Sequence, residues 1–313
     1  MSAPRFAKTA AGLRDAVLEA AWVQWQALGA QGAQRTPSSM VDPEALVLAS
    51  LALKDDEPRL WDFLHGFAGL GSRLLSVQRL QGMVRALPPE AGERLADFAR
   101  VVTAAGRDPR WRRLAGGGRP AAGRAGKLTS PLGRLTQPAG LMLRLRAGMG
   151  VDVRTDTIAY LLGRGEQWCE VSEIAAALGY AASSVRVATD ALVAARFVVA
   201  DGARPRRCYA GRLRWGALLG EGGGQEQFAP WLPWRDIYAF ALHLSAWAQT
   251  TAARAGSEEL AASLARDFVE SRGAVLTALR IDTVNPRAAL PAGYGNMFSG
   301  AIGSLAKLVR ERV

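Results

Sequence analysis

Residues 172–186 read SEIAAALGYAASSVR, which is two short helical patterns joined by a glycine. In the first pattern, apolar side chains recur at the spacing of one helical face, at Ile174, Ala175 and Leu178. Ser172 stands where a side chain caps the start of such a helix. Gly179 supplies the left-handed backbone with which many helices end. The stretch therefore predicts a helix, a sharp bend at the glycine and the start of a second helix.

The second helix is expected over about residues 182–195, and a hairpin is expected after it. The inward positions of this helix form a single stripe of Val185, Ala188 or Thr189, and Leu192. RFVVA at residues 196–200 predicts a strand, DGARP at 201–205 a turn, and residues 207–213 a returning strand. Another helical pattern opens at Val153. Three helices followed by a hairpin are the element order of a winged helix-turn-helix.

Residues 154–214, about a fifth of the chain, resemble the winged-helix domains of bacterial regulators of the MarR and ArsR kind. That family has an opening helix, S-x-I-A-x-x-L-G, a serine-rich start of the recognition helix, L-x-x-L-x-x-x-G before a hydrophobic residue, and a basic wing. The matching residues are Ser172, Ile174, Ala175, Leu178, Gly179, Ser183, Ser184, Val185, Leu192 and Phe197. Two positions depart from the pattern: Ala181 replaces a capping Ser or Thr, and Ala195-Arg196 replaces the glycine before the strand.

The resemblance implies that the second helix and the hairpin contact DNA. In such domains the recognition helix lies in the major groove, and the wing touches the backbone or the minor groove. Carried over to this chain, Ser183 and Arg186 face base edges, and Arg186 suits the O6 and N7 atoms of guanine. Ala182 and Val187 offer only apolar contact to thymine methyl groups. The implied backbone contacts are Ser172, Tyr180 and Ser184 on the helices, and Arg204, Arg206 and Arg207 at the tip of the wing.

The positive charge of the chain is concentrated in two spans. The chain has 39 Lys and Arg residues against 28 Asp and Glu residues, a formal net charge of +11. Residues 107–146 carry a net charge of +9 and residues 196–214 one of +5, so the remainder of the chain is slightly acidic. Clustered charge of this kind favours a polyanionic partner, and we expect phosphate contacts to dominate the affinity for double-stranded DNA.

The fold class expected is mainly α, with a central winged helix-turn-helix flanked by helical domains. Residues 1–115 are helical by pattern and form an N-terminal domain. Residues 116–140 are rich in Gly, Pro and Arg and form a basic linker. Residues 141–220 form the winged helix-turn-helix domain, in which LMLRLR at 141–146 alternates like a short strand. Residues 221–313 form a helical C-terminal domain.

Several classes of protein find no support in the sequence. Cys169 and Cys208 are too few for a disulfide framework, and His65 and His243 stand in no ligand pattern, so we expect neither a metal nor a cofactor. No motif of a hydrolase or a complete phosphate-binding loop is present, so an enzyme is not expected. The absence of a signal peptide or a long apolar segment predicts a cytoplasmic protein that does not associate with membranes.

The function expected is that of a nucleoid-associated DNA-binding protein, a transcriptional regulator that acts as a homodimer. The alternative is a protein-interaction module, such as the antitoxin or the assembly partner of a neighbouring gene product, because winged helices also dock proteins. In that case Ser183 and Ser184 are helix-cap residues and the wing arginines form a solvated turn.

Overall fold

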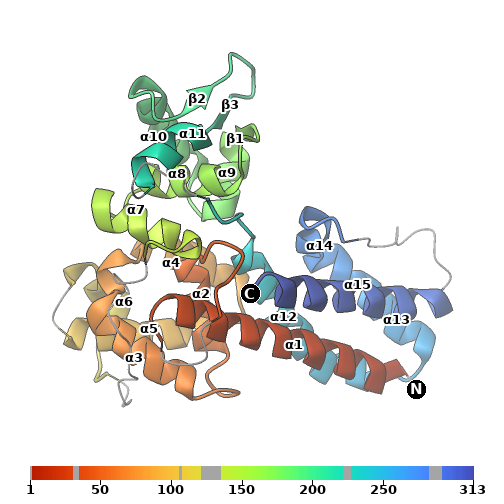
Figure 1. Cartoon of the computed structure of the whole chain (residues 1–313). Helices are drawn as coiled ribbons and strands as arrows, with labels where there is room; N and C mark the ends of the chain where they lie inside the picture. The colour runs from red at the N-terminus through yellow and green to blue at the C-terminus, as the bar shows by residue number, and fades with distance from the viewer. Residues whose placement is uncertain (1, 31–34, 106–107, 121–134, 221–226, 282–290) are drawn as a thin grey trace. The chain divides into compact units, whose positions relative to one another are not determined.

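The computed structural model describes residues 2–30, 35–105, 108–120, 135–220, 227–281 and 291–313 (Figure 1). Contacts between Cα atoms divide the chain into two compact units. Unit 1 comprises Met1–Trp22, Ala86–Pro88 and Pro233–Val313, and unit 2 comprises Val23–Arg85 and Pro89–Leu232. Unit 2 contains the helices and the hairpin on which the expected DNA contact depends, together with most of the N-terminal helices.

The described part of the chain is mainly helical, with a helix content of 70% and one small sheet. The helices of unit 2 are α2 (Pro43–Ala52), α3 (Arg59–Leu70), α4 (Val77–Met83), α5 (Glu90–Ala104), α6 (Arg112–Ala115), α7 (Leu141–Met149), α8 (Val153–Gly163), α9 (Val171–Leu178), α10 (Ala182–Ala194) and α11 (Arg212–Leu219). Its strands are β1 (Cys169–Glu170), β2 (Val199–Ala200) and β3 (Arg207–Tyr209). Short 3-10 turns connect them at η1 (Ser72–Leu74), η2 (Val84–Ala86), η3 (Pro109–Trp111) and η5 (Pro138–Gly140).

Unit 1 is built from helices alone in the described residues. They are α1 (Ser2–Ala27), which continues into unit 2, α12 (Trp234–Thr250), η7 (Ala252–Arg254), α13 (Glu258–Arg272), α14 (Ala274–Ala278) and α15 (Pro291–Glu311). The rings of Phe6, Trp247 and Phe298 meet with centroids 5.4–5.7 Å apart and join α1, α12 and α15. Across the described ranges of both units, no helix combines the length and the apolar character needed to span a membrane.

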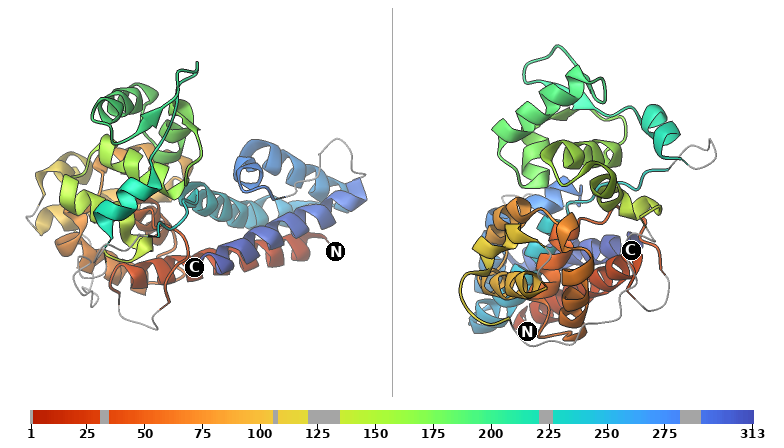
Figure 2. Two further views of the ribbon diagram at one scale, coloured as in Figure 1. Left: turned by 45° about the horizontal axis from the view of Figure 1, so that its top comes forward. Right: turned by 90° about the vertical axis from the view of Figure 1, so that its left-hand side faces the viewer.

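Unit 2 has two helical layers, which are visible in Figure 1 and in the right-hand view of Figure 2. One layer contains α2, α3, α5 and α6, which pack against one another, with α4 against α2. The other contains α8, α9 and α10, which also pack against one another. Helix α7 packs on α8 and lies between the layers in Figure 1.

The pair of helices α9 and α10 confirms the expected bend. Gly179 ends α9 in the left-handed conformation, with φ 72° and ψ 27°. The inward stripe of α10 consists of Val185, Ala188, Thr189 and Leu192, all of them buried. The predicted cap by Ser172 is wrong, because α9 begins one residue earlier, at Val171, with Glu170 as its N-cap. The hydroxyl of Ser172 instead donates to the Glu170 carboxylate at 3.2 Å.

The hairpin is shorter than expected and belongs to a three-stranded antiparallel sheet of order β1-β3-β2. Strands β2 and β3 pair with Val199 opposite Tyr209, so only the ends of the expected strands at 196–200 and 207–213 form a ladder. The expected return strand at 207–213 is shorter because helix α11 begins at Arg212. Strand β1 was not predicted, and it pairs Cys169 with Cys208 of β3.

The possible strand at residues 141–146 is wrong, because these residues begin α7. The buried residues of α7 do not alternate as they would along a strand; they are Leu141, Met142, Leu143, Leu145 and Arg146. Alternation was therefore a coincidence within a helical pattern. The helical register also turns Arg146 inward, where it is only 1% exposed.

Two arginines and three carboxylates form a buried ion-pair network in unit 2, which consists of Asp42, Glu44, Arg79, Arg146 and Asp156. Arg146 binds Asp156 through two hydrogen bonds of 2.7 and 2.8 Å and binds Glu44 at 2.6 Å. Arg79 binds Asp42 at 2.7 Å and also pairs with Glu44. All five side chains are at most 1% exposed. The network therefore joins α2, α4, α7 and α8 through contacts that water does not reach.

Ion pairing outweighs burial in setting the pKa values of Asp156 and Arg146. Burial alone would raise the pKa of Asp156, but the charges of Arg146 and Arg79 and the hydrogen bonds from Arg146 and Tyr180 lower it below the usual value of 3.8. Burial alone would lower the pKa of Arg146, but Asp156 and Glu44 raise it. Asp156 and Arg146 are thus held in their charged forms by their partners, and the loss of one partner leaves an uncompensated charge in the core.

We predict that Arg146→Met lowers the free energy of unfolding by about 3–5 kcal/mol, because Glu44 and Asp156 lose a shared counter-charge in a dry environment. Urea denaturation followed by circular dichroism measures the change. The matched control is Arg113→Met on the exposed face of α6, which is expected to change the value by no more than about 0.5 kcal/mol. A loss below about 1 kcal/mol for Arg146→Met would show that the network is not structural.

Candidate nucleic-acid interface

Helix α10 has one face in the core and one face in solvent. Ser183, Arg186, Val187 and Asp190 are exposed on the side opposite the buried stripe, and Val187 is 70% exposed. We call these four residues the outer face of α10. The amphipathic period of 3.6 residues explains both faces, because the stripe that packs on α8 and α9 turns the remaining positions toward solvent. The outer face therefore offers a hydroxyl, a guanidinium and an apolar group to a partner.

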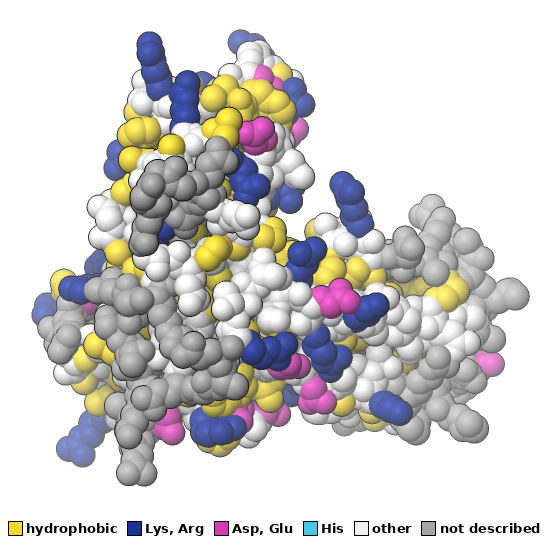
Figure 3. All heavy atoms as spheres, in the orientation of Figure 1, with side chains coloured by type: hydrophobic (Ala, Val, Ile, Leu, Met, Phe, Trp, Pro, Cys, Tyr) yellow, Lys and Arg dark blue, Asp and Glu magenta, His cyan; other side chains and the backbone are white. Residues whose placement is uncertain are grey.

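The β2–β3 hairpin lies beside this outer face. Arg206 of the hairpin forms an ion pair with Asp190 of α10, which ties the turn to the helix. Arg207 pairs with Asp201 across the hairpin at 2.7 Å, and the Asp201 carboxylate also accepts the backbone N–H of Arg207 at 3.0 Å. Arg204 is exposed and has no ion pair among the described residues. In Figure 3, Lys and Arg side chains project from this part of unit 2, with acidic side chains between them.

The pairing reduces the charge that the sequence count suggested, but it does not remove it. Arg206 and Asp190 are 40% and 52% exposed, and an exposed pair of this kind contributes about 0–1 kcal/mol, so a phosphate group competes with the Asp190 carboxylate at little cost. Arg207 is 46% exposed, although its partner Asp201 is only 16% exposed. Arg186, Arg196 and Arg204 carry exposed charge with no ion pair in the described part of the chain.

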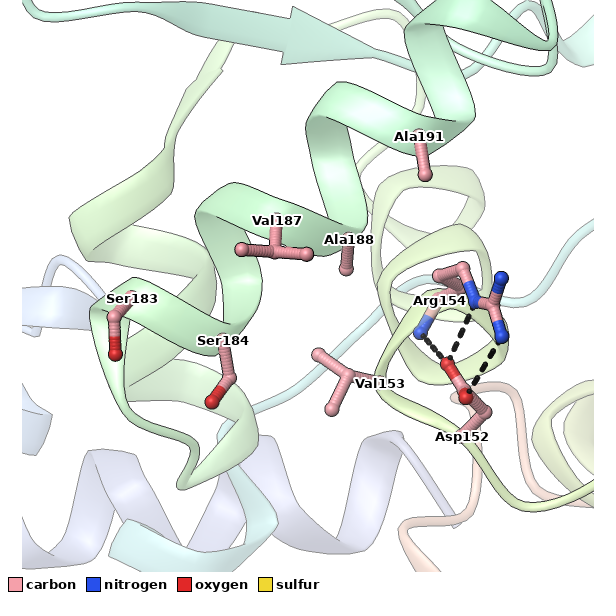
Figure 4. A pocket seen from close by; sticks show the side chains of 8 residues that line it. All are labelled: Asp152, Val153, Arg154, Ser183, Ser184, Val187, Ala188 and Ala191. Carbon is pink, nitrogen blue, oxygen red and sulfur yellow. Dashed lines mark hydrogen bonds and ion pairs between the residues drawn. The ribbon is translucent and has the colours of Figure 1, made fainter.

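A groove of about 460 Å³ runs between α10 and the start of α8 (Figure 4). Its lining residues are Asp152, Val153, Arg154, Ser183, Ser184, Val187, Ala188 and Ala191. Figure 4 shows Val153 pointing from α8 toward α10, and Arg154 beside Asp152 at the rim. Arg154 binds Asp152 at 3.1 Å and is more than half exposed. Sequence reasoning missed Arg154 because it precedes the bend by some 25 residues, although it opens a helix that packs on α10.

The predicted contacts divide into two groups. Ser183, Ser184 and Arg186 lie together on α10, and Ser184 is partly buried at the groove. Arg204, Arg206 and Arg207 lie together on the hairpin. These six residues are brought to one region of unit 2 by the pairing of Arg206 with Asp190.

Ser172 and Tyr180 do not join this region. Ser172 is exposed on the first turn of α9, but the carboxylates of Glu170 and Glu173 flank it, so its surroundings are unfavourable for a phosphate. Tyr180 is only 8% exposed, and its hydroxyl donates to Asp156 at 2.7 Å. Burial and the nearby Asp156 raise the pKa of Tyr180. The assignment of Tyr180 to a phosphate contact is therefore wrong, because its hydroxyl is buried against Asp156, whereas the contact expected of Ser172 stays a prediction.

The basic span of residues 107–146 presents less positive charge to solvent than its net charge of +9 suggests. Arg146 belongs to the buried network and presents no charge to solvent. Arg110 pairs with Asp108, and Arg144 donates to the backbone carbonyl of Leu219. Residues 121–134, which make up most of the expected linker at 116–140, lie outside the described residues.

Comparison of the chain with protein-family models, with curated proteins and with solved structures gives no match. Within the described ranges, no group of three His, Cys, Asp or Glu side chains is arranged to hold a metal ion. The assignment of a function therefore depends on the geometry of unit 2.

The turn after α10 has an unusual backbone. Arg196 has φ 62°, in the left-handed region that glycine adopts most easily. The N–H of Phe197 donates to the carbonyl of Leu192 at 2.9 Å, which closes the end of the helix and directs the chain into β2. Because the Cβ atom of an L-residue comes too close to the following carbonyl oxygen in this conformation, an arginine here is strained.

We predict that Arg196→Gly raises the free energy of unfolding by about 0.5–1 kcal/mol, since relief of the left-handed strain exceeds the entropy that glycine adds to the unfolded chain. Ala195→Gly is the matched control, because Ala195 has an ordinary φ of −77° and its replacement is expected to lower stability by about 0.5–1 kcal/mol. Urea denaturation of the two variants and of the unaltered chain measures these changes in the free energy of unfolding. Equal shifts in the same direction would contradict the assignment of strain.

Proposed function

We propose that residues 153–209 form a winged helix-turn-helix that binds double-stranded DNA, with α10 as the recognition helix and the β2–β3 hairpin as the wing. The observation that carries the proposal is the outer face of α10, which is exposed beside an arginine-bearing hairpin. A helix with a free face of this kind fits the major groove, which is about 12 Å wide, and the adjacent hairpin then reaches the backbone.

The proposed base contacts come from Arg186 and Val187. Arg186 is exposed and has no competing carboxylate partner among the described residues, so its guanidinium is free to donate to guanine O6 and N7. Val187, one residue on, suits a thymine methyl group. Ser183 adds a hydroxyl one turn before Val187. Because only one of these side chains is a strong hydrogen-bonding reader, sequence discrimination by a single α10 is modest.

The proposed backbone contacts come from Arg204, Arg206 and Arg207 on the hairpin and from Arg154 at the groove. Arginine forks suit phosphate oxygens, and each neutralised phosphate releases counterions. This part of the interface supplies most of the affinity and makes it strongly dependent on salt. A homodimer that presents two copies of α10 to two half-sites would double the readout, as expected for a transcriptional regulator.

A second candidate function is the docking of a protein partner, and exposed apolar groups on α11 favour it. Leu213 is 65% and Leu218 is 70% exposed, and both lie on a helix that directly follows the hairpin. Exposed apolar side chains of this size offer contact area to a partner protein. Binding of a partner through α11 leaves the outer face of α10 unaffected, so the two functions have separate tests.

We predict that Arg204→Glu/Arg207→Glu weakens binding to a random-sequence duplex by about tenfold or more at 100 mM salt and reduces the slope of log affinity against log salt by about 2. The physical reason is the loss of two phosphate contacts. Fluorescence anisotropy with a labelled duplex measures both quantities over a series of salt concentrations.

The matched control is Arg272→Glu/Lys307→Glu, which makes the same change in net charge on exposed positions of unit 1. It is expected to change the affinity less than threefold, because net charge acts weakly at a distance in 100 mM salt. Equal losses in the two double variants would mean that total charge, and not the hairpin, attracts DNA. No binding by the unaltered chain at low salt would refute the proposed function.

A further inference from the structure

We infer that α4 is a positioning element for the recognition helix: Ser76, Arg79 and Gly82 hold the bend of residues 178–180, and this contact sets where α10 stands. The inference rests on the proposed function. It concerns residues almost 100 positions before the bend, which the sequence places in a separate helical region. Three successive residues of the bend are each held by a different contact to α4 or to its capping residue.

The first contact is a hydrogen bond to the end of α9. Nε of Arg79 donates to the carbonyl oxygen of Leu178 at 2.7 Å. The last carbonyls of a helix have no partner within the helix and carry partial negative charge, so a guanidinium is a favourable cap. The two terminal nitrogens of Arg79 pair with Asp42 and Glu44 in the buried network. The donor therefore cannot move without breaking buried ion pairs.

The second contact is a close approach of two glycines. A Cβ atom added to Gly82 would lie 2.8 Å from the carbonyl oxygen of Gly179, which is closer than real Cβ atoms come to an oxygen. The obstacle is backbone, and Gly179 is already held in the left-handed conformation that ends α9. Only glycine at position 82 allows α4 and the bend to touch at this distance.

The third contact holds the residue after the bend. The hydroxyls of Ser76 and Tyr180 lie 3.2 Å apart, within hydrogen-bond distance, and the Tyr180 hydroxyl donates to Asp156 at 2.7 Å. Ser76 is also the N-cap of α4, where its side chain accepts the N–H of Arg79. The start of α4 and the residue that leads into α10 are thus joined through one pair of hydroxyls.

The position of the bend matters because α10 starts only two residues after Tyr180. Base contacts need side chains held within about 0.5 Å of their productive position. Ser183 and Arg186 lie in the first two turns of α10, so a displacement of the bend moves them directly. The wing arginines lie on the sheet, and phosphate attraction tolerates small displacements. Loss of the α4 contact should therefore reduce base discrimination more than it reduces overall affinity.

Gly82→Ala tests the inference. Duplexes bound best by the unaltered chain are first selected from a random library, and the affinity ratio of a selected to a scrambled duplex gives the discrimination. We expect Gly82→Ala to lower this ratio about tenfold, which corresponds to one lost base contact, and to leave the affinity for the scrambled duplex and its salt slope within about twofold. Hydrogen exchange of the amides at 178–186 should become faster in the same variant without DNA.

Two further variants separate positioning from general destabilisation. Gly92→Ala in α5 makes the same substitution where an added Cβ meets nothing within 4 Å, so it is expected to leave discrimination and exchange unchanged. Tyr180→Phe keeps the ring and removes its hydroxyl bonds without any clash, and a smaller loss of discrimination, about threefold, is expected. This variant decides the matter if Gly82→Ala fails to fold.

The outcomes distinguish the two proposals. Unchanged discrimination and unchanged exchange in both Gly82→Ala and Tyr180→Phe would overturn the inference while leaving DNA binding intact. An equal loss of affinity for selected and scrambled duplexes would also overturn it, because a merely unfolded fraction produces that result. If the unaltered chain binds no duplex, the proposed function fails, and the exchange rates at 178–186 alone decide whether α4 holds the bend.

Discussion

The buried ion-pair network of Asp42, Glu44, Arg79, Arg146 and Asp156 is the constraint on which the arrangement of unit 2 depends. Charges that water does not reach must be neutralised by partners in good geometry, and here each guanidinium binds two carboxylates. Such a network tolerates few alternative packings, because a shift of any helix that contributes to it separates a pair in a dry environment. Helices α2, α4, α7 and α8 are therefore fixed in one relation.

That relation extends to the surface through the bend between α9 and α10. Arg79, a member of the network, also donates to the carbonyl of Leu178 at the end of α9. Tyr180, which lies just before α10, donates to Asp156 of the network. The outer face of α10 thus belongs to a helix that packs on this core, whereas the hairpin beside it is joined to α10 by the exposed Arg206–Asp190 ion pair, which has a small energy. A rigid helix for base contacts and an adaptable hairpin for phosphate contacts are a sensible division of roles in the proposed interface.

The sequence predicted the local features of this arrangement and missed the long-range ones. Gly179 and the stripe from Val185 to Leu192 are local signals, since helix period and glycine conformation depend on neighbours within a few residues. The burial of Arg146 was missed because its partner Glu44 is 102 positions away, and a count of charges treats every arginine as solvated. Alternation in LMLRLR concealed the same residue by suggesting a strand.

The assignment of Tyr180 failed for a related reason. Its place before the expected recognition helix implied a phosphate contact by resemblance, but the Tyr180 hydroxyl is buried, where it donates to Asp156 and lies within hydrogen-bond distance of Ser76. Strand β1 has only two residues and shows no alternation, so it exists because β3 offers it a partner. Arg154 is a proposed contact only because α8 packs against α10, which no local pattern in the sequence indicates.

Hydrogen–deuterium exchange of the full chain, with and without a saturating random-sequence duplex at low salt, locates the surface that binds DNA. If α10 and the hairpin form that surface, DNA slows exchange in the peptides that cover 182–194 and 199–209 and leaves those that cover 234–272 unchanged. Protection confined to unit 1 or to α11, with none in α10 or the hairpin, would contradict the proposed interface.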